Sequence, residues 1–221
     1  MKEFLPVLRN CALFHQIADA DLPAMMACLG ARTLSFRKKE TIFEEGEPAR
    51  YVGIVLAGKV QILQVDYFGN RSIMTTAGPS ELFGESFACA GVEALPVTAM
   101  AAEDSRVLLV DCLRIMHSCG NACGFHQQMI YNLMRVVAMK NLQFHQKMEI
   151  TGKRTTREKL LAYLMAQAKT AGSSRFRIPF DRQELADYLQ VDRSGLSAEI
   201  SRLRKEGVLK SERSTFELLQ Q

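Results

Sequence analysis

Cysteine and histidine side chains gather in one short stretch of the chain, DCLRIMHSCGNACGFH at residues 111–126. Thiolates and imidazoles bind haem iron, iron–sulfur clusters and zinc, and two neighbouring thiols can form a redox couple. Cys119 and Cys123 would lie one turn apart on a helix. However, Cys-x3-Cys is an unusual spacing for zinc, and reduced cysteines are often buried as small apolar residues. We therefore assign no metal site, and keep Cys119, Cys123 and His126 as candidates for haem, an iron–sulfur cluster or a redox couple.

The six cysteines are expected to be free thiols, because nothing in the sequence directs the chain to an oxidising compartment. The N-terminus lacks the apolar core and the small-residue cleavage site of a signal peptide. No apolar run approaches the roughly 18 residues that a membrane span needs. The sequence thus predicts a cytoplasmic protein with no membrane segment.

A second stretch with chemical potential is basic and lies near the C-terminus. Residues 153–221 hold 14 Lys and Arg against 9 Asp and Glu, whereas the rest of the chain carries a net charge of −1. A positive field confined to the last third favours an anionic partner such as nucleic acid. A solvated basic face would carry the same charge, so the element that displays these residues decides between the two.

The segment FDRQELADYLQVDRSGLSAEISRLRKEGVLK, residues 180–210, predicts two helices joined by a short turn. Asp181 and Glu184 have the spacing of a capping box, which starts the first helix. Asp192 can cap the second helix, which is expected to run over residues 193–206. Two capped helices with a short turn between them form a helix-turn-helix.

The second helix would bury Leu196, Ile200 and Leu203 and turn small residues and arginines outward. Small side chains let a helix approach the bases of a DNA groove, and arginines near its N-terminal end can donate to base edges. The following segment, VLKSERSTFEL, predicts a hairpin wing with a polar tip that contacts phosphates. An αα-hairpin that only packs is the alternative. The predicted DNA contacts are Arg182, Arg193, Ser194, Ser197, Ala198, Arg202, Arg213 and Ser214.

Two further regions of the chain must position the predicted DNA contacts. Between residues 33 and 111, short runs of Val, Ile and Leu bounded by glycines are typical of strands in a β-roll, and residues 68–70 predict a hairpin turn. Residues 125–151 contain no glycine or proline and carry an apolar stripe, which predicts one helix of seven turns. A roll covers only part of such a helix, so we expect a second copy of the chain to cover the rest. Packing within one chain is the alternative.

Together these elements predict an α+β chain with an N-terminal double-stranded, jelly-roll-like β-roll, a long central dimerisation helix and a C-terminal winged helix-turn-helix. We expect an effector-sensing roll with short N-terminal helices at residues 1–118 and the central helix at residues 119–150. The DNA-binding domain is expected at residues 151–221.

Three segments carry a family resemblance: IFEEGEPARYVGIVLAGKVQI (42–62), FGES (83–86) and IPFDRQELADYLQVDRSGLSAEISRLRKEGVL (178–209). They resemble the opening of the β-roll, the start of the phosphate-binding cassette and the helix-turn-helix of Crp/Fnr-family transcription regulators. The resemblance implies a homodimer that binds palindromic double-stranded DNA, with RNA polymerase as a further partner. It also implies an effector that acts on the roll and re-aims the recognition helices. Family members commonly have arginine where this chain has Ala198 and glutamate where it has Ser194, so we assign no operator sequence.

Cyclic AMP is not the expected effector. Cyclic-nucleotide binders of the family place an arginine shortly after their Gly-Glu pair, where this chain has Leu95 and Pro96, and no Lys or Arg occurs over residues 72–105. A buried phosphate without a cation is at a disadvantage of several kcal/mol. The effector stays unknown, and the resemblance places its pocket at Gly84, Glu85, Ser86, Leu95, Val97, Thr98, Met139 and Phe144.

An enzyme is not expected. A cupin-type metal site needs His and carboxylate ligands inside the roll, yet the histidines stand at positions 15, 117, 126 and 145, outside residues 33–111. No nucleophile–base pair or Gly-rich phosphate loop is found in the sequence.

The iron–sulfur sensors of the family carry an N-terminal cysteine cluster that this chain lacks. A sensor module whose C-terminal domain serves protein contacts remains the alternative to DNA binding.

Overall fold

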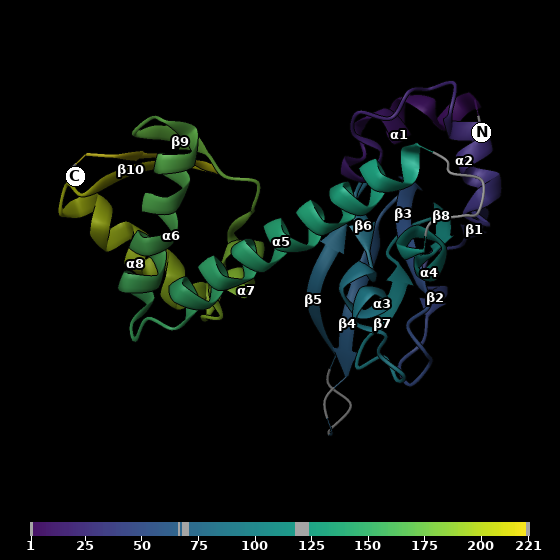
Figure 1. The fold of residues 1–221 in the computed structure, drawn as a ribbon. Coiled ribbons are helices and arrows are strands. Elements are labelled where there is room, and N and C mark those ends of the chain that lie inside the picture. Colours follow the sequence, from purple (N-terminus) through teal and green to yellow (C-terminus); the bar gives the residue numbers. More distant parts are fainter. Residues whose placement is uncertain (1, 66, 68–70, 118–123, 220–221) are drawn as a thin grey trace. The chain divides into compact units, whose positions relative to one another are not determined.

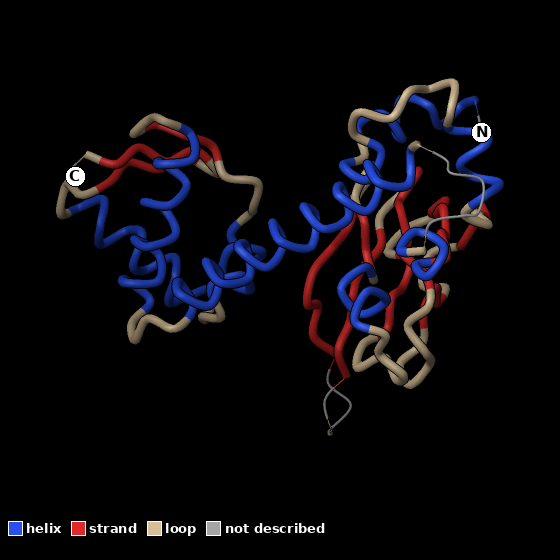
Figure 2. Tube along the Cα trace, viewed as in Figure 1, coloured by secondary structure: helices blue, strands red, loops and turns tan. Residues whose placement is uncertain are grey.

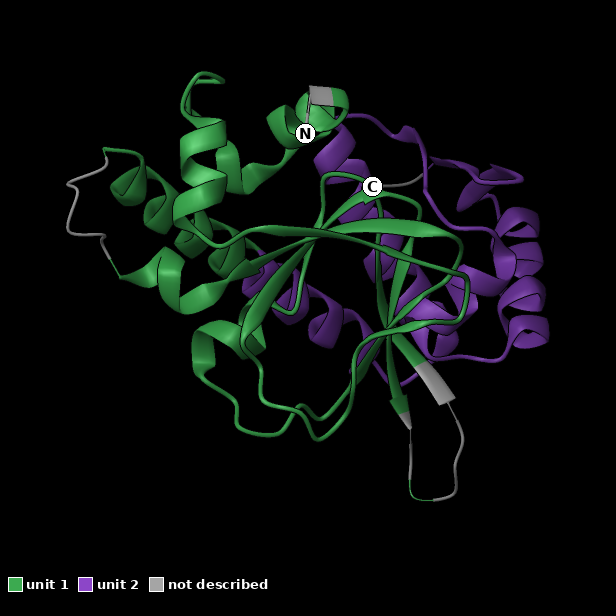
Figure 3. Ribbon diagram, turned by 90° about the vertical axis from the view of Figure 1, so that its right-hand side faces the viewer, with its two compact units in different colours: residues 1–139 green, residues 140–221 purple. Residues whose placement is uncertain are grey.

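The computed structural model describes residues 2–65, 67, 71–117 and 124–219 (Figure 1). Contacts divide the chain into two compact units, residues 1–139 and 140–221 (Figure 3). The hairpin turn expected at residues 68–70 lies outside the described residues. The predicted domain borders after residues 118 and 150 stay predictions.

The first unit contains two four-stranded antiparallel sheets, which form the predicted roll (Figure 2). Their strand orders are β1-β8-β3-β6 and β2-β7-β4-β5. The strands are β1 (Arg32–Phe36), β2 (Thr41–Phe43), β3 (Tyr51–Ala57), β4 (Val60–Val65), β5 (Arg71–Ala77), β6 (Leu82–Phe83), β7 (Thr98–Ala101) and β8 (Ser105–Asp111).

Strand β3 is buried on both faces, which explains its uninterrupted apolar sequence. Because side chains alternate along a strand, Val55 joins the core between the two sheets, whereas Ile54 joins the core under the helices. Gly53 faces Phe83, and a Cβ atom added at Gly53 would lie 2.2 Å from the ring of Phe83. Only glycine leaves room for that ring.

Short helices cover the outer face of the β1-β8-β3-β6 sheet. Leu8, Phe14 and Met25 from these helices share a buried core with Ile54 and Leu108. The helices are the 3₁₀ helices η1 (Lys2–Phe4) and η2 (Ala12–Phe14) and the α-helices α1 (Leu5–Asn10), α2 (Leu22–Cys28), α3 (Glu85–Ala90) and α4 (Cys112–Met116).

The expected long helix is confirmed as α5 (Phe125–Thr151). Its first half packs on the first unit, where Met129 and Leu133 are buried. There the Asn132 amide donates to the carbonyl oxygens of Leu13 (2.9 Å) and His15 (2.7 Å). Residues of the first unit, including its N-terminal helices, therefore cover this part of the apolar stripe.

The second unit packs three helices on a small antiparallel sheet with strand order β10-β11-β9. Its core is lined by aliphatic residues of all three helices and by Phe176 and Phe216 of the sheet. The elements are α6 (Thr156–Ala171), β9 (Arg175–Arg177), α7 (Arg182–Leu189), α8 (Arg193–Lys205), β10 (Leu209–Glu212) and β11 (Thr215–Leu218). Within the described part of the chain, every helix is too short or too polar to cross a membrane.

Candidate nucleic-acid interface

Helix α7 begins at the predicted capping box. The Glu184 N–H donates to Asp181 Oδ1 and the Asp181 N–H donates to Glu184 Oε2, each at 2.8 Å. The helix ends at Gln190, which adopts a left-handed conformation (φ 53°). The Val191 N–H then donates to the carbonyl oxygen of Ala186 at 3.0 Å, which closes the turn toward α8.

Helix α8 begins at Asp192, as expected. The Gly195 N–H donates to Asp192 Oδ2 at 2.9 Å, and the Ser194 hydroxyl donates to the same oxygen. These hydrogen bonds, that of Ser194 first, hold the pKa of Asp192 below its usual range. The cap stays ionised at neutral pH and satisfies backbone donors of the first turn.

The two faces of α8 differ as predicted. Leu196, Ile200 and Leu203 are at most 3% exposed and fill the space toward α6 and α7. The opposite face is exposed and carries the predicted contacts Arg193, Ser194, Ser197, Ala198 and Arg202. A convex, exposed helix with small side chains and an arginine in its first turn has the shape and charge to enter the major groove of DNA.

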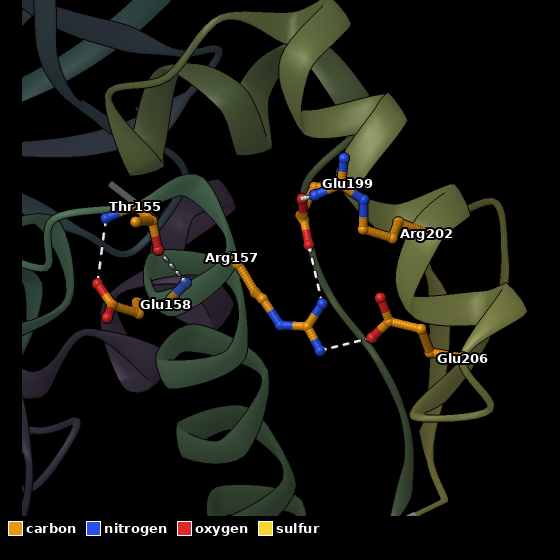
Figure 4. Close-up of polar contacts among 6 residues, drawn as sticks. All are labelled: Thr155, Arg157, Glu158, Glu199, Arg202 and Glu206. Carbon is orange, nitrogen blue, oxygen red and sulfur yellow. Dashed lines mark hydrogen bonds and ion pairs between the residues drawn. The ribbon is translucent and has the colours of Figure 1, made fainter.

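Arg157 of α6 links that helix to α8 (Figure 4). Its guanidinium donates to Glu199 Oε1 at 3.4 Å and to Glu206 Oε2 at 2.6 Å. Arg202 also approaches Glu199, at 3.4 Å. The Glu199 side chain is only 11% exposed, so the network fixes α8 against α6 from beneath the exposed face.

Helix α6 itself starts at a capping box that sequence reasoning missed (Figure 4). The Thr155 N–H donates to Glu158 Oε2 at 3.1 Å, and the Glu158 N–H donates to Thr155 Oγ1 at 3.2 Å. The spacing Thr-x-x-Glu was the available signal. The Arg157 network has no such signal, because its partners lie 42 and 49 positions away.

The predicted wing is the hairpin of β10 and β11, which turns at Arg213 and Ser214. Arg213 is exposed at the tip. The Ser214 hydroxyl donates to the carbonyl oxygen of Phe180 at 3.2 Å and is partly buried. Arg213 is therefore the better placed of the two for a phosphate.

Arg182 differs from the other predicted contacts. It is partly buried, with its guanidinium 5.1 Å from the centre of the Phe216 ring. Burial and the nearby charge of Arg204 lower its pKa. This cation–π contact gives Arg182 a packing role inside the second unit.

Two family models match the two halves of this architecture. "Cyclic nucleotide-binding domain" matches residues 33–113, and "Crp-like helix-turn-helix domain" matches residues 158–220. The chain belongs to the Crp/Fnr family of transcription regulators.

Three known proteins match most of the chain. The transcriptional activator protein FnrA of Stutzerimonas stutzeri is 27% identical over 188 residues, which are 83% of this chain and 75% of FnrA. The structure of FixK2 from Bradyrhizobium japonicum is 26% identical and covers 86% of this chain and 93% of FixK2, with a TM-score of 0.56. The global regulator CLP of Xanthomonas campestris shares the fold, with 15% identity, a TM-score of 0.63 and coverage of 92% of this chain and 100% of CLP.

The effector residues suggested by the Crp/Fnr resemblance fall into two groups. Gly84 precedes α3 in a left-handed conformation (φ 76°), Glu85 and Ser86 begin α3, and the group also contains Leu95, Val97 and Thr98. Met139 and Phe144 are exposed residues of α5, on different units. Depressions of about 960 Å³ (lined by residues 35–40, Ala57 and 104–106) and about 300 Å³ (lined by Cys28, Asp111, Leu113, Arg114, His117 and His126) contain none of these residues. The effector pocket therefore stays a prediction.

Two of the three candidate metal ligands, Cys119 and Cys123, lie outside the described residues. His126 is buried and stacks on Phe125, with 4.9 Å between ring centres. Within residues 2–65, 67, 71–117 and 124–219, no three His, Cys, Asp or Glu side chains are close enough to hold a metal ion.

Proposed function

We propose that this Crp/Fnr regulator is a homodimer that inserts α8 into successive major grooves of a palindromic DNA site. The observation that carries the proposal is the exposed face of α8, on which Arg193 stands in the first turn above a fully buried Leu196. Arginine reads guanine edges through two parallel hydrogen bonds. Arg193 is the base-reading residue, and Arg213 at the wing positions the helix on the phosphates.

An exposed apolar stripe on α5 supports the homodimer. Tyr131, Met134 and Leu142 are 52%, 62% and 62% exposed, and Ala138 is exposed between them. Their spacing places them on one face of the helix, away from the buried Met129 and Leu133. A second α5 is the partner proposed for this stripe, since a coiled-coil contact buries such residues. Leu142→Glu is expected to shift the protein toward monomer in sedimentation, whereas the same change at the exposed Gln146 leaves the dimer intact.

The effector is proposed to act on the roll and to differ from cyclic AMP. No cation occurs over residues 72–105 to pair with a cyclic phosphate. Millimolar cyclic AMP should therefore leave the melting temperature unchanged, because a ligand stabilises only the state that binds it. A concentration-dependent rise would contradict this part of the proposal. Contact with RNA polymerase and a cytoplasmic location, where the promoters lie, belong to the same proposal.

Binding to DNA is tested with a duplex enriched from random-sequence DNA by the wild-type protein. Arg193→Ala should weaken binding to that duplex by about 1–3 kcal/mol, as expected for a residue that reads a base. Lys169→Ala is the matched control, because it removes a positive charge from an exposed residue at the end of α6. Equal affinities of the wild type and Arg193→Ala would favour the alternative in which the C-terminal unit serves protein contacts.

A further inference from the structure

Two cysteines that are 23 positions apart in the sequence meet in the first unit. Cys89 lies near the end of α3, Cys112 is the first residue of α4, and their sulfur atoms are 3.7 Å apart. A disulfide has a sulfur–sulfur distance of about 2.05 Å. The two sulfur atoms would need to approach each other by less than about 2 Å to reach that length.

The two thiols differ in exposure and in proton affinity. Cys89 is partly exposed, whereas Cys112 is 1% exposed. A hydrogen bond from Cys112 lowers the pKa of Cys89, although burial and the nearby Glu85 act against it. The same contact and burial raise the pKa of Cys112. Since the thiolate is the reactive form, the more exposed thiol, Cys89, is also the one that ionises more readily.

We propose that Cys89 and Cys112 form a reversible thiol–disulfide pair that is oxidised by hydroperoxides. The Cys89 thiolate attacks one peroxide oxygen and breaks the O–O bond, which leaves Cys89 as a sulfenic acid and releases water after protonation. Cys112 then attacks the Cys89 sulfur, forms the S–S bond and expels hydroxide, which takes up the Cys112 proton as water. Two thiols and one hydrogen peroxide thus give one disulfide and two waters, and a dithiol reductant reverses the reaction.

The disulfide would tie α3 to α4 and enclose β7 and β8 in a covalent loop. These two helices already pack against each other in the first unit. An effect of this bond on DNA affinity would rest on the proposed function, whereas the chemistry of the pair does not.

Trypsin makes the pair directly observable, because its cleavage sites separate these cysteines from the others. The peptide of residues 72–106 contains only Cys89, and that of residues 107–114 contains only Cys112. The remaining four cysteines fall in the peptides of residues 10–32 and 115–135.

The experiment treats the reduced full-length chain with equimolar hydrogen peroxide, alkylates the remaining thiols and maps the tryptic peptides without reductant. The expected product is peptide 72–106 linked to peptide 107–114, with two hydrogen atoms lost, and dithiothreitol should release both. Oxidation of the other peptides while this linked product is absent would overturn the proposal. No DNA is used, so a failure of the proposed function would leave this result unchanged.

Single variants assign the two roles. Cys112→Ser should stop the reaction at a Cys89 sulfenic acid that dimedone labels, whereas Cys89→Ser should leave Cys112 unoxidised. Cys28→Ser is the control that should form the linked peptide as the wild type does. Circular dichroism of each variant verifies the fold, and dimedone labelling of Cys112 in place of Cys89 would contradict the assignment.

Discussion

The buried side chains of the two units have different roles. In residues 140–221, the core holds α8 so that its opposite face stays exposed with Arg193 and Arg202. In residues 1–139, side chains such as Phe83 and Val97 turn inward and fill the space between two sheets. A surface residue of the second unit can therefore change without disturbing the fold, whereas one methyl group added at Gly53 in the roll meets the packed ring of Phe83.

The largest effect is expected from the core beneath the recognition helix. Leu203 is fully buried, so Leu203→Ala should lower the free energy of unfolding by about 2–5 kcal/mol. Hydrogen exchange should quicken over residues 156–218 and stay unchanged in β3. Lys205→Ala, at an exposed position of the same helix, should change stability by less than about 0.5 kcal/mol. Equal loss of protection in β3 would show that the two cores do not respond separately.

The corresponding change in the roll is Gly53→Ala. The new methyl group would lie 2.2 Å from the buried Phe83 ring, and such overpacking costs about 1–3 kcal/mol. Phe83→Leu should recover part of this loss in a double-mutant cycle measured by chemical denaturation. Gly78→Ala is the control, since its nearest neighbour would be 3.9 Å away. Strictly additive effects at residues 53 and 83 would argue against the contact.

A smaller, pH-dependent effect is expected from Arg157→Gln. Its hydrogen bond to Glu206 lowers the pKa of that carboxyl in the folded state, so the stabilisation is present above the pKa of unfolded Glu and is lost as the pH falls through the lowered value. The melting temperature of the variant should thus fall below that of the wild type at neutral pH, and the difference should shrink on acidification. Arg154→Gln is the control, because the described residues include no ion pair of Arg154. A difference that is independent of pH would contradict the role of Glu206.

The smallest effect is a gain in stability at Gly195. Its backbone is helical, and a Cβ atom there would meet only Asp192 Oδ2, at 3.8 Å. Gly195→Ala should therefore stabilise the protein by about 0.5–1 kcal/mol in chemical denaturation, since alanine is the better helix former. A loss of stability would mean that the first turn of α8 needs glycine.

Much of the second unit could be predicted from the sequence because its helix caps depend on residues only a few positions apart. The Asp181–Glu184 capping box and the Asp192 cap involve residues three positions apart, so their spacing is visible in the sequence. The strands of the roll and the uninterrupted α5 were also visible as apolar runs. The exposure of the α8 face follows from helical periodicity once its ends are known.

Contacts between distant residues could not be predicted in this way. Nothing local in the sequence pairs Arg157 with Glu199, or Cys89 with Cys112, because chain topology brings these residues together. The sequence pointed to Cys119 and Cys123 by their spacing alone, whereas the contact between the Cys89 and Cys112 thiols is visible only in the structure. The effector pocket is equally hard to predict from sequence, since the residues that would line it come from several helices and strands.

The central claim, that α8 reads DNA bases through Arg193, is tested most directly by selection from random-sequence duplexes with the wild type and Arg193→Ala. We expect the wild type to enrich a two-fold symmetric sequence whose half-sites lie about 34 Å, one helical turn, apart. The variant should lose the preference at one position of each half-site and keep the others. Enrichment of the same sequence by both proteins, or of none by the wild type, would contradict the claim.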